Sequence, residues 1–190
     1  MTAQLPVSTD VQRAKLTARD FWLLADSGAF EGFAKTELIE GEIWVVNSVY
    51  VWHAKTMAYL ATELTLALRA LGSDLVVYSS GSVDMSDDSV PEPDVSIGED
   101  HDEKGLPLNK LALAIEVSDS TLANDLTSKA PLYARHGVPE YWVVDREGRR
   151  VIQMWAPEGD AYAERREMAF GQRIEGATVK GLAVETAALK

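Results

Sequence analysis

The chain has 190 residues, of which 46% are hydrophobic, and a formal net charge of −12 at pH 7. This length favours one domain with a core of ordinary size, and the absence of cysteine excludes disulfide scaffolds, thiolate zinc sites and cysteine nucleophiles. The acidic charge argues against a protein that coats nucleic acid, because lysine and arginine supply nonspecific affinity for phosphate. The acidity is local, however: residues 84–125 hold twelve acidic and two basic residues, so the remaining chain sums to only −2.

The first residues, 1–16, are interpreted as a polar tail, and residues 17–190 are predicted to form a single domain. The chain begins without an apolar segment followed by a small-residue cleavage site, and it has no uncharged apolar run of the roughly 20 residues that span a bilayer. We therefore expect a cytoplasmic protein with no membrane partner.

Two short elements are predicted near the start of this domain. Thr17 to Asp20 has the form of a capping box, followed by apolar residues and a stop at Gly28, which predicts a short helix. Residues 36–39 and 42–46 flank a Glu-Gly pair and are rich in β-branched residues, so they predict a hairpin.

A long helix and two strands follow. From Ala54 to Leu71, apolar residues recur at intervals of three and four, which predicts a helix over about residues 51–71. Residues 75–79 and 94–97 are short apolar segments typical of strands, and the prolines between them exclude a continuous helix.

The next three elements define the fold class. Residues 111–117 are nearly all apolar, as in a strand buried on both faces, although they include Glu116. Residues 121–136 predict a helix and residues 140–145 a second strand, so a parallel crossover is expected. The rest of the chain gives weak strand signals punctuated by glycine. The sequence therefore predicts a mixed α/β fold.

Two acids lie at or near the ends of neighbouring strands: Asp94 follows Pro93, and Glu116 interrupts an apolar run. An isolated buried carboxylate is costly, so Glu116 should be paired, protonated or metal-bound. Two carboxylates with carbonyl and water oxygens would form the hard site that Mg²⁺ or Mn²⁺ prefers. The alternative is structural: Glu116 points to solvent and Asp94 caps a turn.

An ordered set of motifs then resembles a known family. The set comprises Glu37 to Glu42, His53, Pro93-Asp94, residues 115–118, Asp125 with Lys129 and Tyr133, and residues 137–145 (GVPEYWVVD). Together they resemble the Uma2 family, formerly a domain of unknown function, which is grouped with the PD-(D/E)XK nucleases as "putative restriction endonucleases". The resemblance spans about residues 36–151.

The resemblance implies a restriction-endonuclease-like α/β/α core with a central mixed sheet, preceded by the N-terminal helix and hairpin. It makes Asp94 and Glu116 the expected metal ligands, with Mg²⁺ or Mn²⁺ as cofactor. The superfamily lysine usually lies two residues after the acid, where this chain has Ser118, so the resemblance moves that role to Lys129. The alternative for Lys129 is an exposed ion pair with Asp125, one helical turn away, worth about 0.3–0.5 kcal/mol.

Further candidates are His53 and Glu42, because the superfamily often takes another acid from its first core helix and His53 begins that helix. Equally, His53 could bond a backbone carbonyl and Glu42 could be a plain hairpin residue. Tyr133 shares the helical face of Lys129 and would position it or pack in the core. Pro131 lies inside this predicted helix, so a kink or a new helix start is expected there.

The function expected from these residues is metal-dependent cleavage of DNA phosphodiester bonds by a metal-activated water, with Asp94, Glu116 and Lys129 as catalytic residues. Two alternatives stay open: an inactive nuclease-fold binding or assembly module, such as a homodimer built on exposed Trp52 or Trp155, and a hydrolase of small phosphodiesters. The candidates for DNA phosphate contacts are Arg135, Arg146, Arg149, Arg150, Arg165 and Arg166.

Overall fold

The computed structural model describes residues 13–189 of the chain, so most of the predicted tail lies outside the described residues. The predicted N-terminal elements are confirmed. Helix α1 (Ala18–Asp26) begins at Thr17, whose side chain and that of Asp20 form the reciprocal hydrogen bonds of a capping box. Strands β1 (Lys35–Ile39) and β2 (Glu42–Val46) pair in an antiparallel hairpin, and the turn residues Glu40 and Gly41 both have positive φ, as a tight hairpin turn requires.

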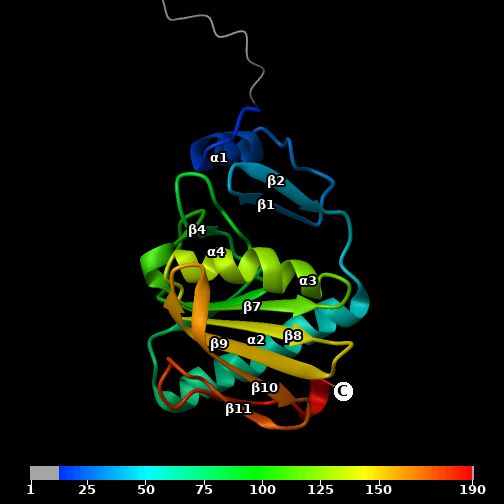
Figure 1. The fold of residues 1–190 in the computed structure, drawn as a ribbon, viewed down its shortest axis with the longest axis vertical. Helices are drawn as coiled ribbons and strands as arrows, with labels where there is room; N and C mark the ends of the chain where they lie inside the picture. Colours follow the sequence, from blue (N-terminus) through cyan, green and yellow to red (C-terminus); the bar gives the residue numbers. More distant parts are fainter. Residues whose placement is uncertain (1–12, 190) are drawn as a thin grey trace, which may run out of the picture.

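A six-stranded mixed sheet forms the centre of the molecule (Figure 1), and its order is β10-β9-β8-β7-β5-β3. The strands are β3 (Val76–Ser79), β5 (Val95–Gly98), β7 (Leu111–Ser118), β8 (Glu140–Asp145), β9 (Arg150–Glu158) and β10 (Ala161–Ala169). The predicted parallel crossover is confirmed, since β7 and β8 pair in parallel, and the other neighbours in the sheet are antiparallel.

Helices cover both faces of this sheet (Figure 1), which confirms the predicted α/β class. Helix α2 (Val51–Leu71) has the predicted bounds, but its buried stripe is narrower than expected, because Ala54 and Leu71 are exposed while Leu60, Leu64 and Leu68 are buried. No helix among residues 13–189 is both long and apolar enough to cross a membrane.

The opposite face is covered by the helical segment predicted over residues 121–136, which has three parts, and the new helix start expected at Pro131 is confirmed. Helix α3 (Leu122–Asn124) leads into the π-helical turn η2 (Asp125–Lys129), and α4 (Ala130–Arg135) follows. Pro131 explains the interruption. It has no N–H to donate to the preceding turn, and it lies in the first turn of α4, where that N–H is not needed.

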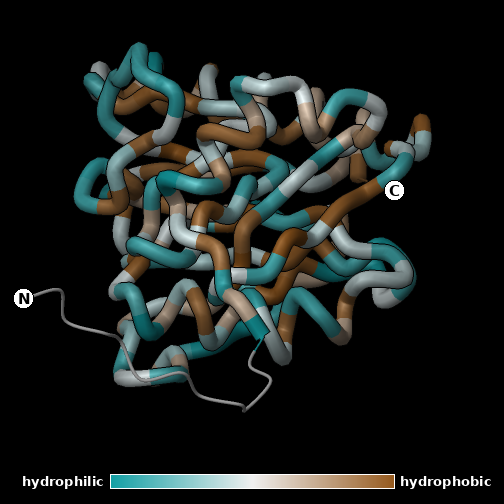
Figure 2. The backbone as a smooth tube through the Cα atoms, turned by 90° about the horizontal axis from the view of Figure 1, so that it is seen from above, coloured by the Kyte–Doolittle hydropathy of each residue, from teal (hydrophilic) through white to brown (hydrophobic). Residues whose placement is uncertain are grey.

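The core forms two layers, one on each side of the sheet, and alternate residues of β8 supply them. Tyr141 and Val143 pack on the α4 side, whereas Trp142 and Val144 pack against α2. Seen from above, the hydrophobic stretches of the backbone run through the middle of the molecule and the hydrophilic ones lie mainly in the surrounding loops (Figure 2). Burial on both faces accounts for the nearly continuous apolar sequence of β7 and β8.

Short strands complete the fold: β4 (Val83–Asp84) pairs with β6 (Leu106–Pro107), and β11 (Arg173–Glu175) pairs with β12 (Ala183–Glu185). Glu140 anchors the chain near β11 to the sheet. Its carboxylate is fully buried and accepts hydrogen bonds from the Trp142 indole, the Gln153 amide, and the backbone N–H groups of Ala177 and Thr178. This residue of the PEYWVVD motif therefore has a structural role.

Candidate functional site

A cavity of about 490 Å³ brings together the candidate residues from five elements. The hairpin supplies one wall and the start of α2 a second. Asp94 just before β5, the end of β7 and the π-helical turn η2 supply the rest. The ionisable side chains that line it are Lys35, Glu37, Tyr50, His53, Asp94, Glu116, Asp119, Asp125 and Lys129.

Asp94 precedes β5 and is held by three donors. Its Oδ2 accepts a 2.8 Å hydrogen bond from the Val117 N–H and lies 3.2 Å from His53 Nε2, while Oδ1 is 3.1 Å from Lys35 Nζ. Burial alone favours the neutral acid, but the Lys35 ammonium, His53 and the Val117 N–H together hold the pKa of Asp94 well below its usual range. Asp94 is therefore a fixed, ionised carboxylate.

Glu116 lies on the central strand β7 with 2% of its surface exposed. Its Oε1 is 2.8 Å from Lys129 Nζ and accepts a 3.3 Å hydrogen bond from the Tyr133 hydroxyl, and its Oε2 is 3.4 Å from Lys35 Nζ. Burial raises the pKa of Glu116 to about 8 despite both ammonium groups. Tyr133 therefore holds Glu116 from within the core, where it also packs against Tyr141.

Lys129 is buried at the end of the π-helical turn, so the alternative of an exposed pair with Asp125 is wrong. Its ammonium lies 2.8 Å from Glu116 Oε1 and 2.9 Å from Glu37 Oε1. Burial opposes its charge, but these carboxylates raise the pKa of Lys129 above its ordinary value. Asp125 instead accepts hydrogen bonds from the hydroxyl groups of Ser118 and Thr121, and burial raises its pKa.

Two residues of β1 complete the cluster and were not among the predicted site residues. Glu37 is 4% exposed and accepts a hydrogen bond from the Glu92 N–H in addition to Lys129. The Lys35 ammonium contacts Asp94 and Glu116 and lies 3.9 Å from Glu37. Strand alternation is the sequence feature that could have identified them, because it puts residues 35, 37 and 39 on the same side of the strand.

The two further candidates, His53 and Glu42, differ in position. His53 lies in the cavity beside Asp94 and bonds that carboxylate. Glu42 lies outside it, with its side chain 56% exposed and paired with Lys15 at 2.7 Å. Glu42 lies beside the hairpin turn, opposite Ile39, whereas Glu37 lies opposite Trp44 in the cavity wall and supplies the additional acid.

The residues fit a divalent cation by their chemistry, although the ammonium groups lie between the acids. Among residues 13–189, no group of three or more His, Cys, Asp or Glu side chains is arranged to hold a metal ion. Lys35 explains this: its ammonium contacts one oxygen of Asp94 and one of Glu116, so a cation already stands between the two carboxylates. Carboxylate oxygens are the donors that Mg²⁺ and Mn²⁺ prefer, and withdrawal of Lys35 leaves both directed at a common point.

The sequence matches the Uma2 family, described as "Putative restriction endonuclease", over residues 28–187. The chain belongs to the Uma2 family. Its fold is similar to that of a solved structure from Anabaena variabilis, described as a putative nuclease belonging to DUF820, with a TM-score of 0.63 and 16% identity over 81% of this chain and 88% of that one. A comparison with curated proteins finds no match. These results confirm the predicted family and a nuclease-like fold.

Most arginines predicted to contact phosphate are engaged within this Uma2 protein. Arg135, Arg146, Arg150 and Arg165 pair with carboxylates, and Arg166 bonds Gln153 and the Glu175 carbonyl. Arg149 makes no ion pair or side-chain hydrogen bond with the other described residues. Trp52 and Trp155, predicted to be exposed, are half-buried, and each lies beneath an arginine.

Proposed function

We propose that this Uma2 protein is a metal-dependent endonuclease that hydrolyses DNA phosphodiester bonds in the cytoplasm, with residues 17–190 acting as one nuclease-like domain. The observation that supports this most directly is the convergence of Asp94, Glu116 and Lys129 in one cavity. The side chains come from the residue before β5, from β7 and from the π-helical turn, yet Glu116 contacts both lysines, and Lys35 links it to Asp94.

Asp94 and Glu116 are the residues that would hold Mg²⁺ or Mn²⁺. When bound, such an ion supplies Lewis-acid stabilisation of the phosphate and activates the attacking water. Asp94 suits this role because the Val117 N–H and His53 fix its orientation. Tyr133 does the same for Glu116. Positioned ligands reduce the reorganisation needed in the reaction.

Lys129 is the group that acts on the phosphate. Its ammonium remains charged at neutral pH, because the carboxylates around it raise its pKa. It therefore stabilises the negative charge that develops on the phosphate oxygens, and a charged ammonium cannot accept the proton of the attacking water. Glu37 holds the ammonium at 2.9 Å and keeps it directed toward Glu116.

The competing function is an inactive binding or assembly module with the nuclease fold. It is favoured by the same lysines, since Lys35 and Lys129 already neutralise the carboxylates that a metal would need. A homodimer would belong to this second function. The two functions differ in whether the purified protein binds metal and cuts DNA.

The test is incubation of supercoiled plasmid and short oligonucleotides with purified protein and Mg²⁺ or Mn²⁺. Asp94→Asn and Glu116→Gln should abolish cleavage and metal binding measured by calorimetry, and Lys129→Met should reduce cleavage while metal binding persists. Glu42→Gln is the matched control, because Glu42 lies outside the cavity. Cleavage that survives Glu116→Gln excludes the proposed site, and a wild-type protein that neither cuts nor binds metal supports the inactive module.

A further inference from the structure

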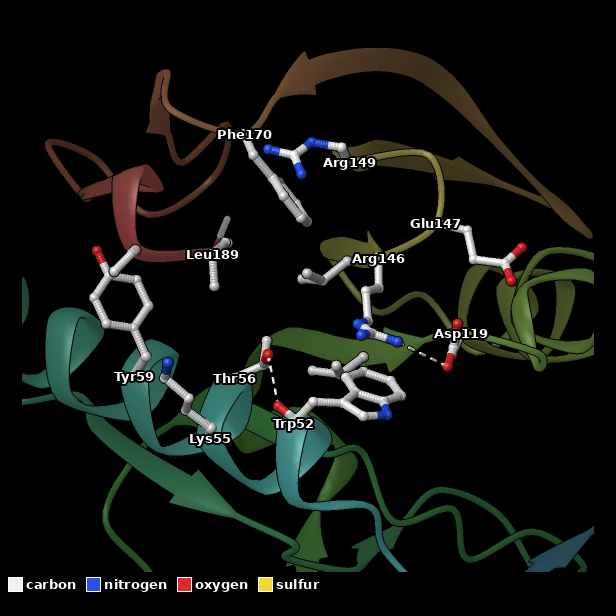
Figure 3. Close-up of a pocket in the computed structure, with 13 residues that line it drawn as sticks. Trp52, Lys55, Thr56, Tyr59, Asp119, Arg146, Glu147, Arg149, Phe170 and Leu189 are labelled. Carbon is white, nitrogen blue, oxygen red and sulfur yellow. Dashed lines mark hydrogen bonds and ion pairs between the residues drawn. The ribbon is translucent and has the colours of Figure 1, made fainter.

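A second cavity, of about 520 Å³, adjoins the candidate site (Figure 3). It lies beside the first turns of α2, at the ends of β7 and β8, and under the turn that leads from β8 to β9. Trp52, Val117 and Asp119 line both cavities, so the two share a wall. Its volume is within the range of about 300–1,000 Å³ typical of small-ligand pockets.

Aromatic rings line this second cavity. Trp52 is half-buried, and the guanidinium of Arg146 lies 4.5 Å from the centre of its ring. The Phe170 ring points into the cavity from the opposite side (Figure 3). Tyr59 is fixed at the margin, where its hydroxyl donates a 2.6 Å hydrogen bond to the Glu185 carbonyl. Flat rings held in place in this way are suited to stacking against a nucleobase, whatever the base is.

Basic side chains surround the rings. Arg146 pairs with Asp119 at 3.3 Å, but Lys55 and Arg149 make no ion pair or side-chain hydrogen bond with the other described residues. The neighbouring Arg150, by contrast, has two carboxylate partners. Lys55 and Arg149 are therefore available for a phosphate group.

The backbone conformation of Arg149 also supports a role in phosphate binding. Its φ of 51° lies in the left-handed region, which L residues with side chains adopt at a cost of roughly 1–2 kcal/mol. The turn thus places an arginine where glycine or asparagine would be less strained, and Figure 3 shows its guanidinium beside Phe170 at the cavity margin. A phosphate-binding role gives a physical reason for an arginine at this position.

We propose that this second cavity binds one unpaired nucleotide of the substrate strand, adjacent to the scissile phosphate, with its base between Phe170 and the Arg146 guanidinium that lies over Trp52, and its phosphate on Lys55 and Arg149. This inference rests on the proposed nuclease function, because that function makes the neighbouring cavity the place where the phosphate is cleaved. The nucleotide must be unpaired, because a base within a duplex has no free face for an aromatic ring. The preferred substrate is therefore a single strand or a duplex with an unpaired end, bulge or loop.

The test measures binding without metal, so that it is separate from cleavage. Fluorescence anisotropy of a labelled 12-nucleotide oligo(dT), in EDTA and low salt, compares the binding affinity of wild type with those of Arg149→Gln, Lys55→Gln and Phe170→Leu. Loss of ring stacking should weaken binding by about fivefold or more. Loss of one phosphate contact should lower the slope of log affinity against log salt by about 0.7.

Arg69→Gln is the matched control. Arg69 is exposed on α2, as Lys55 is, and likewise makes no ion pair with the other described residues, but it lies fourteen residues further along the helix, about 21 Å away. This variant should bind the oligonucleotide as wild type does. Circular dichroism of each variant confirms that it is folded.

The outcomes separate this inference from the proposed function. If wild type does not bind the single strand, or if the cavity variants bind it as well as Arg69→Gln does, the inference is overturned whether or not the protein cuts DNA. Tighter binding of a blunt duplex, or equal binding of free thymidine monophosphate, also overturns it. If the cavity variants lose binding but wild type cuts nothing in Mg²⁺ or Mn²⁺, the cavity assignment holds and the nuclease function fails.

Discussion

Replacing Lys129 by methionine should destabilise the metal-free protein by about 3–5 kcal/mol, the usual cost of removing one partner from a buried ion pair. Lys129 is 4% exposed, and its ammonium lies within 2.9 Å of both Glu116 and Glu37. Methionine retains the unbranched shape, so the packing changes little and the loss is electrostatic. Glu37 then stays buried without its closest cation.

An exposed pair on one helix would give a result about ten times smaller, roughly 0.3–0.5 kcal/mol. Urea unfolding in EDTA, followed by tryptophan fluorescence, distinguishes the two values. The double variant Lys129→Met with Glu37→Gln should recover much of the loss, because both members of the pair are then neutral. Lys104→Met is the control, since Lys104 forms an exposed pair with Asp26. A loss below about 1 kcal/mol for Lys129→Met would refute the buried-pair reasoning.

Three further predictions follow from the same contacts. Lys35→Met should tighten Mn²⁺ binding about tenfold by calorimetry, because it removes the ammonium between Asp94 and Glu116; unchanged or weaker binding would show that Lys35 does not occupy the position of the cation. The pKa of Glu116 rises from 4.5 to about 8 on folding, so ionisation of this group should lower the unfolding free energy of the metal-free protein as pH rises from about 4.5 to 8. Glu116→Gln should remove that contribution, which is at most about 1.4 kcal/mol per pH unit, and parallel pH profiles for variant and wild type in urea unfolding would contradict it. Glu140→Gln should cost about 1–3 kcal/mol in thermal or urea unfolding, because an amide nitrogen cannot accept the hydrogen bonds that the buried carboxylate accepts, whereas the exposed Glu158→Gln should change little.

Local patterns were enough to predict the hairpin, the bounds of α2 and the parallel pairing of β7 with β8. Each depends on residues close in sequence or on a periodicity within one element. The apolar run around Glu116 also predicted a buried carboxylate that requires partners, and it has them. The motif order led to Lys129, which lies thirteen residues after Glu116 and contacts it directly.

The contributions of Lys35 and Glu37 could not be predicted in the same way. Glu37 meets Lys129 across 92 positions of sequence, and Lys35 meets Glu116 across 81, so only the tertiary fold brings them together. The hairpin contains several acids, and sequence alone does not say which of them faces inward. Glu42 pairs with Ile39 beside the turn and Glu37 with Trp44 near the cavity, so the position along the hairpin separates these two acids.

The π-helical turn ahead of Pro131 makes the site sensitive to chain length. Five residues, Asp125–Lys129, fill a turn that closes between Ala130 N–H and the Asp125 carbonyl. Deleting one of them would favour an ordinary α-helical turn and rotate what precedes it by about 100° relative to α4. Single-residue deletions here should therefore be much less tolerated than substitutions of an exposed turn residue such as Thr127, and a deletion scan across residues 119–129 would mark this turn as a segment whose length is under constraint.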